Sequence, residues 1–305
     1  MEKEQKTAYL YALGAVLAWS TVSTAFKLSL RHLSPLGLLL FSSLFATLFL
    51  AAVNLFTGNL KQIGLISRQW KRSLAAGLLN PFLYYLVLFV AYDRLRAQEA
   101  QVLNYTWAIV LSVLSILILR ERFRIRDMLA LLLSFLGVIV ISTQGRILRL
   151  TFSDPLGSAL AVSSSLVWAF YWILNMKDKR PAESKLFCGF VIGTLLTILY
   201  AIIRGKLNSG GLFVPGSVAL LGILGGLYVG IFEMGFTFIL WQKALDKSSN
   251  TAAVSNLIFL TPFISLVFIA AILRESIHPA TLIGLVIIIG SNFWQKGFFT
   301  PKRRN

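Results

Sequence analysis

Long apolar runs, each about as long as a bilayer core is thick, follow one another along this chain and are separated by short polar connections. We distinguish ten runs of roughly 20 residues, the length that a transmembrane helix needs. They lie near residues 8–30, 35–57, 73–93, 97–119, 126–143, 155–175, 184–203, 215–241, 250–273 and 279–296. The runs are continuously apolar and do not alternate with polar residues, so the pattern predicts membrane-spanning helices and excludes a β-barrel.

The fourth and ninth runs resemble each other in sequence. Glu99–Glu121 reads EAQVLNYTWAIVLSVLSILILRE, and Ser255–Glu275 reads SNLIFLTPFISLVFIAAILRE. A shift of about 154 residues superposes the Arg-Glu pairs that end both runs, which indicates a chain built from two copies. Each copy holds five runs, an odd number, so the second copy must enter the membrane from the opposite face. We therefore predict an all-α integral membrane protein with ten transmembrane helices, arranged as two inverted five-helix repeats over residues 1–150 and 151–305.

The composition agrees with a membrane protein. Hydrophobic residues make up 57% of the chain and charged residues 13%, whereas a soluble protein is about one-quarter charged. The net charge of +17 comes from Lys and Arg in the connections, with 20 on the side of the N-terminus and 9 on the other side. This imbalance predicts a multi-pass protein of the cell (inner) membrane with both termini in the cytoplasm, and no nucleic-acid partner.

Signatures of enzymes and of metal sites are missing from the sequence. No Gly-rich phosphate loop with Lys is present, His32 and His278 both lie in connections, and no pair of acids lies within a run. Cys188 is the single cysteine, which rules out an intramolecular disulfide and a thiolate metal cluster. We expect no enzyme activity, no cofactor and no metal. Many inverted repeats form secondary transporters around a midplane site, and this is the function that we favour. The alternative is a non-transporting membrane enzyme or a lipid-handling scaffold.

Glu233 is the clearest candidate for a functional residue. It lies far from both ends of the eighth run, where a charged side chain costs about 2.5–3.5 kcal/mol on insertion scales. Such an acid indicates a contact with a substrate amine or a protonatable gate. The alternative is a protonated Glu that joins neighbouring helices. Gly226, Gly230 and Gly235 are close to it and favour close backbone approach or local unwinding.

Amide and aromatic side chains give candidates for a substrate site in the fourth, third and ninth runs. Asn104 and Trp107 lie three residues apart and share one helical face, where they offer hydrogen bonds and an apolar, cation-binding ring. Asn256 is the nearest counterpart of Asn104 in the second copy. Asn80, before Pro81, frees a backbone carbonyl, and Tyr84 follows on the same face one turn later. Helix–helix packing and a static kink are the alternatives for these residues.

Four further residues complete the candidate set: Trp19, Trp168, Tyr171 and Glu99. Trp19, Trp168 and Tyr171 lie within runs and not at the interfaces, so we expect them in cavity walls or in core packing. Trp241, by contrast, falls near the end of a run and is predicted to be an interface anchor. Glu99 is a candidate gate acid, with a surface pair to the nearby arginines as the alternative.

Taken together, these features resemble the drug/metabolite transporter superfamily, and within it the EamA-type transporters. The resemblance covers nearly the whole chain: ten spans in two halves, a Trp in the first span of each half (Trp19 and Trp168), and a Glu at the end of the fourth span of each half (Glu121 and Glu275). It implies a basket of ten helices, a central cavity and export of small metabolites.

One motif is similar to a signature of the aromatic amino acid exporter branch. It is Glu99-x4-Asn104-Tyr105-x-Trp107. That branch usually has Pro after the Trp, whereas this chain has Ala108 there and the Pro only in the second copy.

The candidate residues and the resemblance together predict a secondary transporter. We expect it to move small neutral or zwitterionic metabolites, in particular to export amino acids, by alternating access at a midplane cavity between the repeats. Protons are a candidate coupling partner, through Glu233 and Glu99. The fold needs no second chain to complete its cavity, so we expect a monomer in the lipid bilayer.

Overall fold

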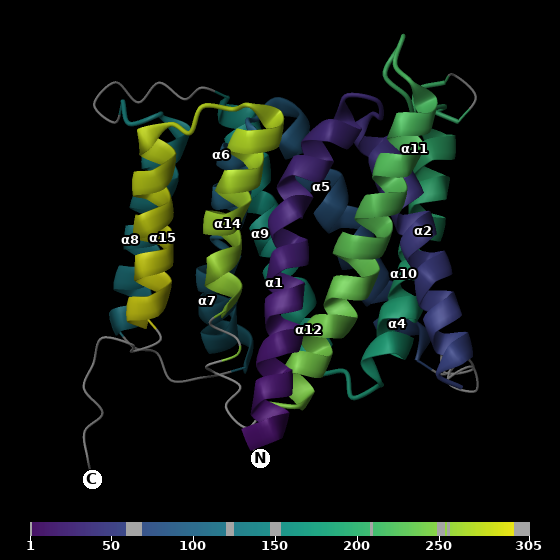
Figure 1. Ribbon diagram of the computed structural model, residues 1–305, viewed down its shortest axis with the longest axis horizontal. Helices are drawn as coiled ribbons and strands as arrows, with labels where there is room; N and C mark the ends of the chain where they lie inside the picture. Colours follow the sequence, from purple (N-terminus) through teal and green to yellow (C-terminus); the bar gives the residue numbers. More distant parts are fainter. Residues whose placement is uncertain are drawn as a thin grey trace.

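The computed structural model describes residues 2–58, 69–119, 125–146, 154–207, 210–248, 254 and 257–295, and these residues form an upright bundle of helices (Figure 1). The predicted all-helical membrane fold is confirmed. The first half contains α1 (Glu2–Leu30), α2 (Pro35–Phe56), α4 (Trp70–Gly77), η2 (Leu78–Leu83), α5 (Tyr84–Arg94), α6 (Ala97–Asn104), α7 (Trp107–Leu119) and α8 (Ile125–Ser142). The second half contains α9 (Pro155–Met176), α10 (Ala182–Ile203), α11 (Ala219–Tyr228), η4 (Val229–Phe236), α12 (Thr237–Asp246), η5 (Leu257–Leu260), α14 (Thr261–Phe268), η6 (Ile269–Leu273) and α15 (Pro279–Gln295).

These elements combine into ten membrane crossings. Six crossings are long and apolar enough to be recognised by length and composition within the described residues: Glu4–Leu30, Pro35–Phe56, Trp70–Arg94, Pro155–Asn175, Ala182–Ile203 and Ala219–Asp246. The other four are α6 with α7, α8, η5 with α14 and η6, and α15. Their large apolar side chains that face outward, such as Leu132 and Val286, suit a lipid environment.

Four crossings are not regular α-helices, which the apolar pattern did not predict in full: the third, the fourth and the ninth, and the eighth, in which η4 is a π-helix. In the third crossing, Asn80 has φ −142° and ψ 118°, because a residue before proline is driven away from the helical region. The predicted kink at Asn80 is therefore present. The fourth crossing breaks at Tyr105 and Thr106, between α6 and α7, and the ninth starts as the short η5 before Pro262 begins α14.

The packing of the helices shows an exchange between the halves: the first helix of each half packs against helices of the other half. In the first half, α1 packs against α12 and α14 of the second half. In the second half, α9 packs against α5 and α7 of the first half. The same exchange relates α2, which packs on α11 and η4, to α10, which packs on α4 and η2. The pairs α2–α10 and α8–α15 join corresponding helices of the two halves.

Contacts at one edge of the bundle show that the halves are inverted. Lys27, near the end of α1, donates a hydrogen bond to the carbonyl of Leu95, just after α5 (2.8 Å). Asp154, the N-cap of α9, forms an ion pair with Arg94 at the end of α5 (3.0 Å). The end of α1 and the beginning of α9 therefore lie at the same edge, the upper edge in Figure 1, and the two helices run in opposite directions. We call the opposite edge, where α1 begins, the lower edge.

A buried ion pair holds the lower edge together. Arg180 and Asp178, in the connection before α10, face each other at 2.6 Å, and the Arg180 side chain also donates to the Ser73 hydroxyl of α4 (2.7 Å). Burial alone would raise the pKa of Asp178, but hydrogen bonds from the Arg180 side chain and backbone amide outweigh it and hold the pKa below its usual value. Asp178 is therefore ionised at neutral pH and keeps this connection fixed to α4.

Candidate functional site

A cavity of about 360 Å³ lies in the middle of the bundle, where the two halves meet. Both halves contribute to it: α1, α5, α6 and α7 from the first, and α9, η4, α12, η5 and α14 from the second. The exchanged packing explains this position, because α1 and α9 each lie between helices of the other half. A volume of this size is at the lower end of the range of about 300–1,000 Å³ that is usual for small-molecule sites.

Aromatic rings form one continuous wall of the cavity. Trp168 of α9 stacks on Tyr84 of α5, with 4.5 Å between the ring centroids, and meets the edge of Phe238 of α12 at 5.7 Å. Trp19 of α1 continues the wall and packs on Phe238 at 5.7 Å and on Trp241 at 5.6 Å. Four helices that are far apart in sequence thus supply one ring surface, which we call the aromatic wall.

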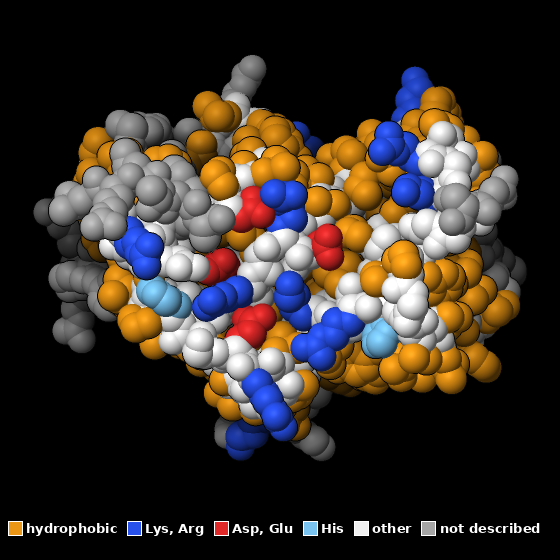
Figure 2. Space-filling view, turned by 90° about the horizontal axis from the view of Figure 1, so that it is seen from above, with side chains coloured by type: hydrophobic (Ala, Val, Ile, Leu, Met, Phe, Trp, Pro, Cys, Tyr) orange, Lys and Arg blue, Asp and Glu red, His pale blue; other side chains and the backbone are white. Residues whose placement is uncertain are grey.

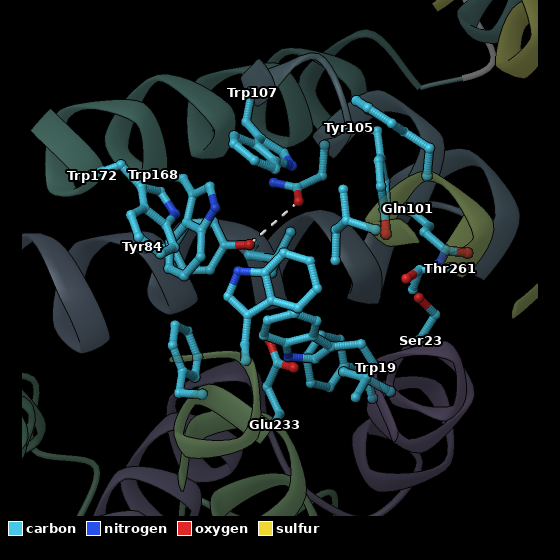
Figure 3. A pocket seen from close by; sticks show the side chains of 18 of the residues that line it. Trp19, Ser23, Tyr84, Gln101, Tyr105, Trp107, Trp168, Trp172, Glu233 and Thr261 are labelled. Carbon is cyan, nitrogen blue, oxygen red and sulfur yellow. Dashed lines mark hydrogen bonds between the residues drawn. The ribbon is translucent and has the colours of Figure 1, made fainter. Parts of the chain in front are cut away.

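Trp107 and a few polar groups face the aromatic wall across the cavity (Figure 3). Asn104 accepts a hydrogen bond from the Tyr84 hydroxyl (3.3 Å) and donates one to the Ser164 hydroxyl (2.8 Å). Both of its amide atoms are thus engaged. Gln101 of α6 and Thr261 of α14 add further polar groups, so the cavity is mainly apolar with a small number of placed polar atoms.

Glu233 lies at the base of the cavity on η4, and its side chain joins the two halves. Its Oε1 accepts a hydrogen bond from the hydroxyl of Tyr85 on α5 (2.9 Å). Glu233 is 9% exposed and Tyr85 is fully buried. The indole of Trp19 lies beside the same carboxyl group (Figure 3). A carboxyl group within the membrane-spanning part of the bundle needs such partners, because an unpaired polar group there is costly.

The side chains that line the cavity toward the upper edge are buried, and several of those toward the lower edge are half-buried. Its upper part is lined by buried side chains such as Phe26 and Tyr92, which are 2% and 3% exposed. Its lower part is lined by the half-buried Trp172 and Leu245, near the lower ends of α9 and α12, and by the half-buried Leu111 in the second turn of α7.

Hydrogen bonds between α6 and the connection before α15 close the upper edge. Gln98 donates to the carbonyl of Ser276 (2.9 Å) and accepts from the backbone amide of His278 (3.0 Å). Glu275 accepts from the backbone amide of Ala97 at the start of α6 (3.3 Å). We call this group of contacts the upper latch. Around it, acidic and basic side chains alternate near the centre of this face (Figure 2), where Lys27, Arg31, Asp93 and Glu275 line a small pocket.

The structure brings six of the predicted site residues to the cavity and places three others outside it. Those at the cavity are Trp19, Tyr84, Asn104, Trp107, Trp168 and Glu233. Tyr171 is buried behind the aromatic wall and stacks on Trp168 with 5.5 Å between centroids. Asn80 is buried at the kink and Glu99 at the upper edge, and neither lines the cavity. Asn256, like Glu121, lies outside the described residues.

Three interpretations of individual residues are corrected by the structure. Trp241, predicted to be an interface anchor, is 8% exposed and lines the cavity, because α12 continues beyond the predicted end of its run. Glu99 makes no surface pair with the nearby arginines: it is 4% exposed and accepts a hydrogen bond from Gln144 (3.2 Å). Asn104 and Trp107 both reach the cavity, but from two separate helices and not from one continuous face.

Several residues of the cavity escaped the sequence analysis. Thr261 had a signal, since a shift of 154 residues places it on Trp107. Tyr85, the partner of Glu233, had none, because a Tyr among other aromatic residues of a membrane run is typical of packing. Within the described residues, no group of three or more His, Cys, Asp or Glu side chains lies close enough to hold a metal ion.

Comparisons with known proteins agree with this architecture. The model of the EamA-like transporter family matches the chain twice, at residues 6–143 and 155–294. An uncharacterized transporter of Archaeoglobus fulgidus is 28% identical over 93% of this chain and 95% of its own length. Another, from Clostridium kluyveri, is 23% identical over 94% of this chain and 92% of its own. A solved crystal structure that is 19% identical covers 96% of this chain and 97% of its own, with a TM-score of 0.64, which supports the fold. The chain therefore belongs to the EamA-like transporter family, and it is a secondary transporter of the membrane and not an enzyme.

Proposed function

We propose that this transporter moves small neutral or zwitterionic metabolites about the size of an amino acid, and that it exports them by alternating access. The observation that carries the proposal is the cavity of about 360 Å³ between the inverted halves. Its walls are aromatic rings, amides and a single acid, which suits a solute with an apolar body and a polar end. Substrate sites at the interface of inverted repeats are typical of secondary transporters.

Alternating access is supported by the unequal burial of the side chains toward the two edges. The upper latch and the buried Phe26 and Tyr92 separate the cavity from the upper edge, while half-buried side chains lie between it and the lower edge. Because the halves are inverted copies, exchange of their conformations would open the upper edge and close the lower one. One substrate site would then face each side of the membrane in turn.

The direction of transport follows from the proposed orientation. The side that holds the N-terminus carries 20 of the 29 Lys and Arg residues, which predicts that the lower edge and both termini face the cytoplasm. A cavity with its less buried lining toward the cytoplasm is placed to load an internal metabolite. The aromatic wall is also consistent with the similarity of the Glu99–Trp107 stretch to the aromatic amino acid exporter branch, and amino acids are therefore the first substrates to test.

The test combines binding with flux. Purified protein is screened for a rise in thermal stability with amino acids and related metabolites, because a ligand that binds only the folded state stabilises it by mass action. Each ligand found is then measured for saturable efflux from proteoliposomes, with protein-free liposomes as the control. A lipid-handling scaffold, the alternative function, gives no saturable flux of any of these solutes, and that result would overturn the proposal.

A further inference from the structure

The charge of the cavity is unbalanced. Among the described residues that line it, Glu233 is the one carboxyl group, and none is Lys, Arg or His. The nearest basic side chain at the upper end is Lys27, whose ammonium donates to the carbonyl groups of Tyr92 and Leu95 (2.7 and 2.8 Å) and is thereby engaged outside the cavity. A bound solute therefore meets one carboxyl group and no basic side chain among these residues.

Among the described residues, the Glu233 carboxyl group keeps one oxygen without a direct donor, although the indole of Trp19 also lies within reach of the carboxyl group. Tyr85 donates to Oε1, whereas Oε2 is buried and has no hydrogen-bond donor within the described residues. A buried carboxylate oxygen without a donor is costly, and a charged N–H donor satisfies it better than a neutral one. The residue lines the cavity, so a donor on the solute can approach it.

The rings around Glu233 favour the same kind of group. Trp19 lies beside the carboxyl group (Figure 3). The rings of Phe238 and Trp241 pack against Trp19. The face of an aromatic ring is negative and attracts a cation within about 6 Å, most strongly when the ring is Trp and the site is dry. Carboxylate and rings together form a site for an ammonium group.

A carboxylate on the solute has weaker partners. Both amide atoms of Asn104 are engaged, with Tyr84 and Ser164, and the remaining groups are neutral amides and hydroxyls such as Gln101 and Thr261. Neutral donors bind a carboxylate less strongly than Arg or Lys does.

We infer that Glu233 and the rings of Trp19 and Trp241 form an ammonium site, and that the preferred substrates are monoamines with an apolar or aromatic body and no carboxylate. This inference rests on the proposed function, and it narrows the substrate class of the same cavity. Amino acids bind through their ammonium group, and their carboxylate is tolerated, not recognised. Organic acids of the same size are rejected.

Three solutes with one body and different charge test the inference. All three solutes contain the same indole ring. At pH 7 tryptamine carries a positive charge, tryptophan carries one positive and one negative charge, and 3-indolepropionate carries a negative charge. Binding of each to the purified protein is measured by calorimetry. We expect tryptamine to bind at least about tenfold tighter than tryptophan, and 3-indolepropionate to bind weakest. Tryptophan binding as tightly as tryptamine would overturn the inference while leaving the proposed function intact. No binding of any of the three would also overturn the inference, whereas the proposed function falls only if no solute of the wider screen shows saturable flux.

Variants of Glu233 identify the group responsible. Glu233→Gln should remove the preference for tryptamine, so that tryptamine and tryptophan bind within about twofold of each other. Glu233→Asp keeps the charge and should keep the order of the three solutes, which shows whether a loss in the Gln variant reflects charge or folding. Glu183→Gln, in the first turn of α10 and outside the cavity, is the matched control and should behave as the unmodified protein. An unchanged order in Glu233→Gln would overturn the inference.

Discussion

Trp107 differs from the other tryptophans of the cavity in its surroundings. Trp168 and Trp19 pack on the rings of the aromatic wall, whereas Trp107 is half-buried on α7 and faces the wall across the cavity. Its ring is placed to close on a bound solute. Shortening it should therefore remove a contact with the substrate and leave the packing of the bundle largely unchanged.

We predict that Trp107→Ala lowers flux of the true substrate at least about fivefold while the yield of folded protein stays nearly constant. Flux per folded molecule, measured in proteoliposomes, checks this. Trp70→Ala is the control: Trp70 is 52% exposed at the start of α4, and its removal should leave flux unchanged. If Trp107 served packing, its loss would destabilise the fold by about 3–5 kcal/mol and leave the activity of each folded molecule normal.

Glu233 combines two roles that a single carboxyl group can perform. As a carboxylate it holds the ammonium group of the solute, and once protonated it no longer does. Its position on η4, bonded to Tyr85 of the other half, means that its environment changes when the halves move. We therefore expect binding of a proton and of substrate to compete at this residue.

We predict that Glu233→Gln abolishes the response of transport to a pH gradient and leaves exchange of bound substrate partly active. Gln keeps the shape of the side chain and most of its hydrogen bonding but does not titrate. An inward proton gradient should drive the unmodified protein and not the variant, and efflux from liposomes at matched and unmatched pH measures this. A uniporter would give the same flux with and without the gradient, and Glu233→Gln would not change that flux. This outcome would show that Glu233 does not couple protons to transport.

At the scale of elements, the sequence predicts where the membrane crossings are and misses how some of them break. The apolar runs locate all ten crossings, because length and hydrophobicity suffice for that. Pro81 reveals the kink of the third crossing, since proline removes a donor and restricts its neighbour. The break at Tyr105 and Thr106 has no such marker in the fourth crossing; α6 and α7 both pack on α9 and α8, and α6 adds contacts to α1, α5 and α15.

The upper latch is an element-scale device that the sequence did not indicate. It joins α6 of one half to the connection before α15 of the other, through Gln98, and it must open before the cavity can face the upper edge. Gln98 is fully buried, so its side chain has no water to replace these bonds. Loss of the side chain should therefore favour the conformation that is open at this edge.

We predict that Gln98→Ala speeds labelling of a cysteine at Ser23 from outside the cell at least severalfold. Ser23 lines the upper part of the cavity and is 3% exposed. The measurement uses a membrane-impermeant maleimide and a Cys188→Ser background, which leaves one thiol. Gln242→Ala removes a glutamine whose bond to Asp246 lies at the opposite edge, and it should not change labelling at Ser23. Equal rates in both variants would show that Gln98 does not hold the edge closed.

At the scale of the whole molecule, the inverted repeat was predictable and the cavity was predictable only in part. A similarity between two runs and an odd number of spans per copy are enough to predict opposed halves. Which side chains meet at the centre depends on the exchange of α1 and α9 between the halves, and single runs carry no information about it. For this reason the sequence identified Trp19, Trp168 and Glu233 as site candidates, because each is an unusual bulky or polar residue within a run. It did not identify Tyr85 as the partner of Glu233 or Trp241 as a residue of the cavity.

The orientation in the membrane is the remaining whole-molecule prediction. The excess of Lys and Arg on the N-terminal side predicts that the lower edge faces the cytoplasm and that Ser276, bound to Gln98 in the upper latch, lies on the outer face. In the Cys188→Ser background, a cysteine at position 122 or in the C-terminal tail should react with an impermeant maleimide only after the cells are opened. A cysteine at position 276 should react in intact cells. Because residues 122 and 276 follow the equivalent Arg-Glu pairs of the two copies, labelling of both from one side would contradict the inverted repeat itself, and exchange of the two sides would contradict only the orientation.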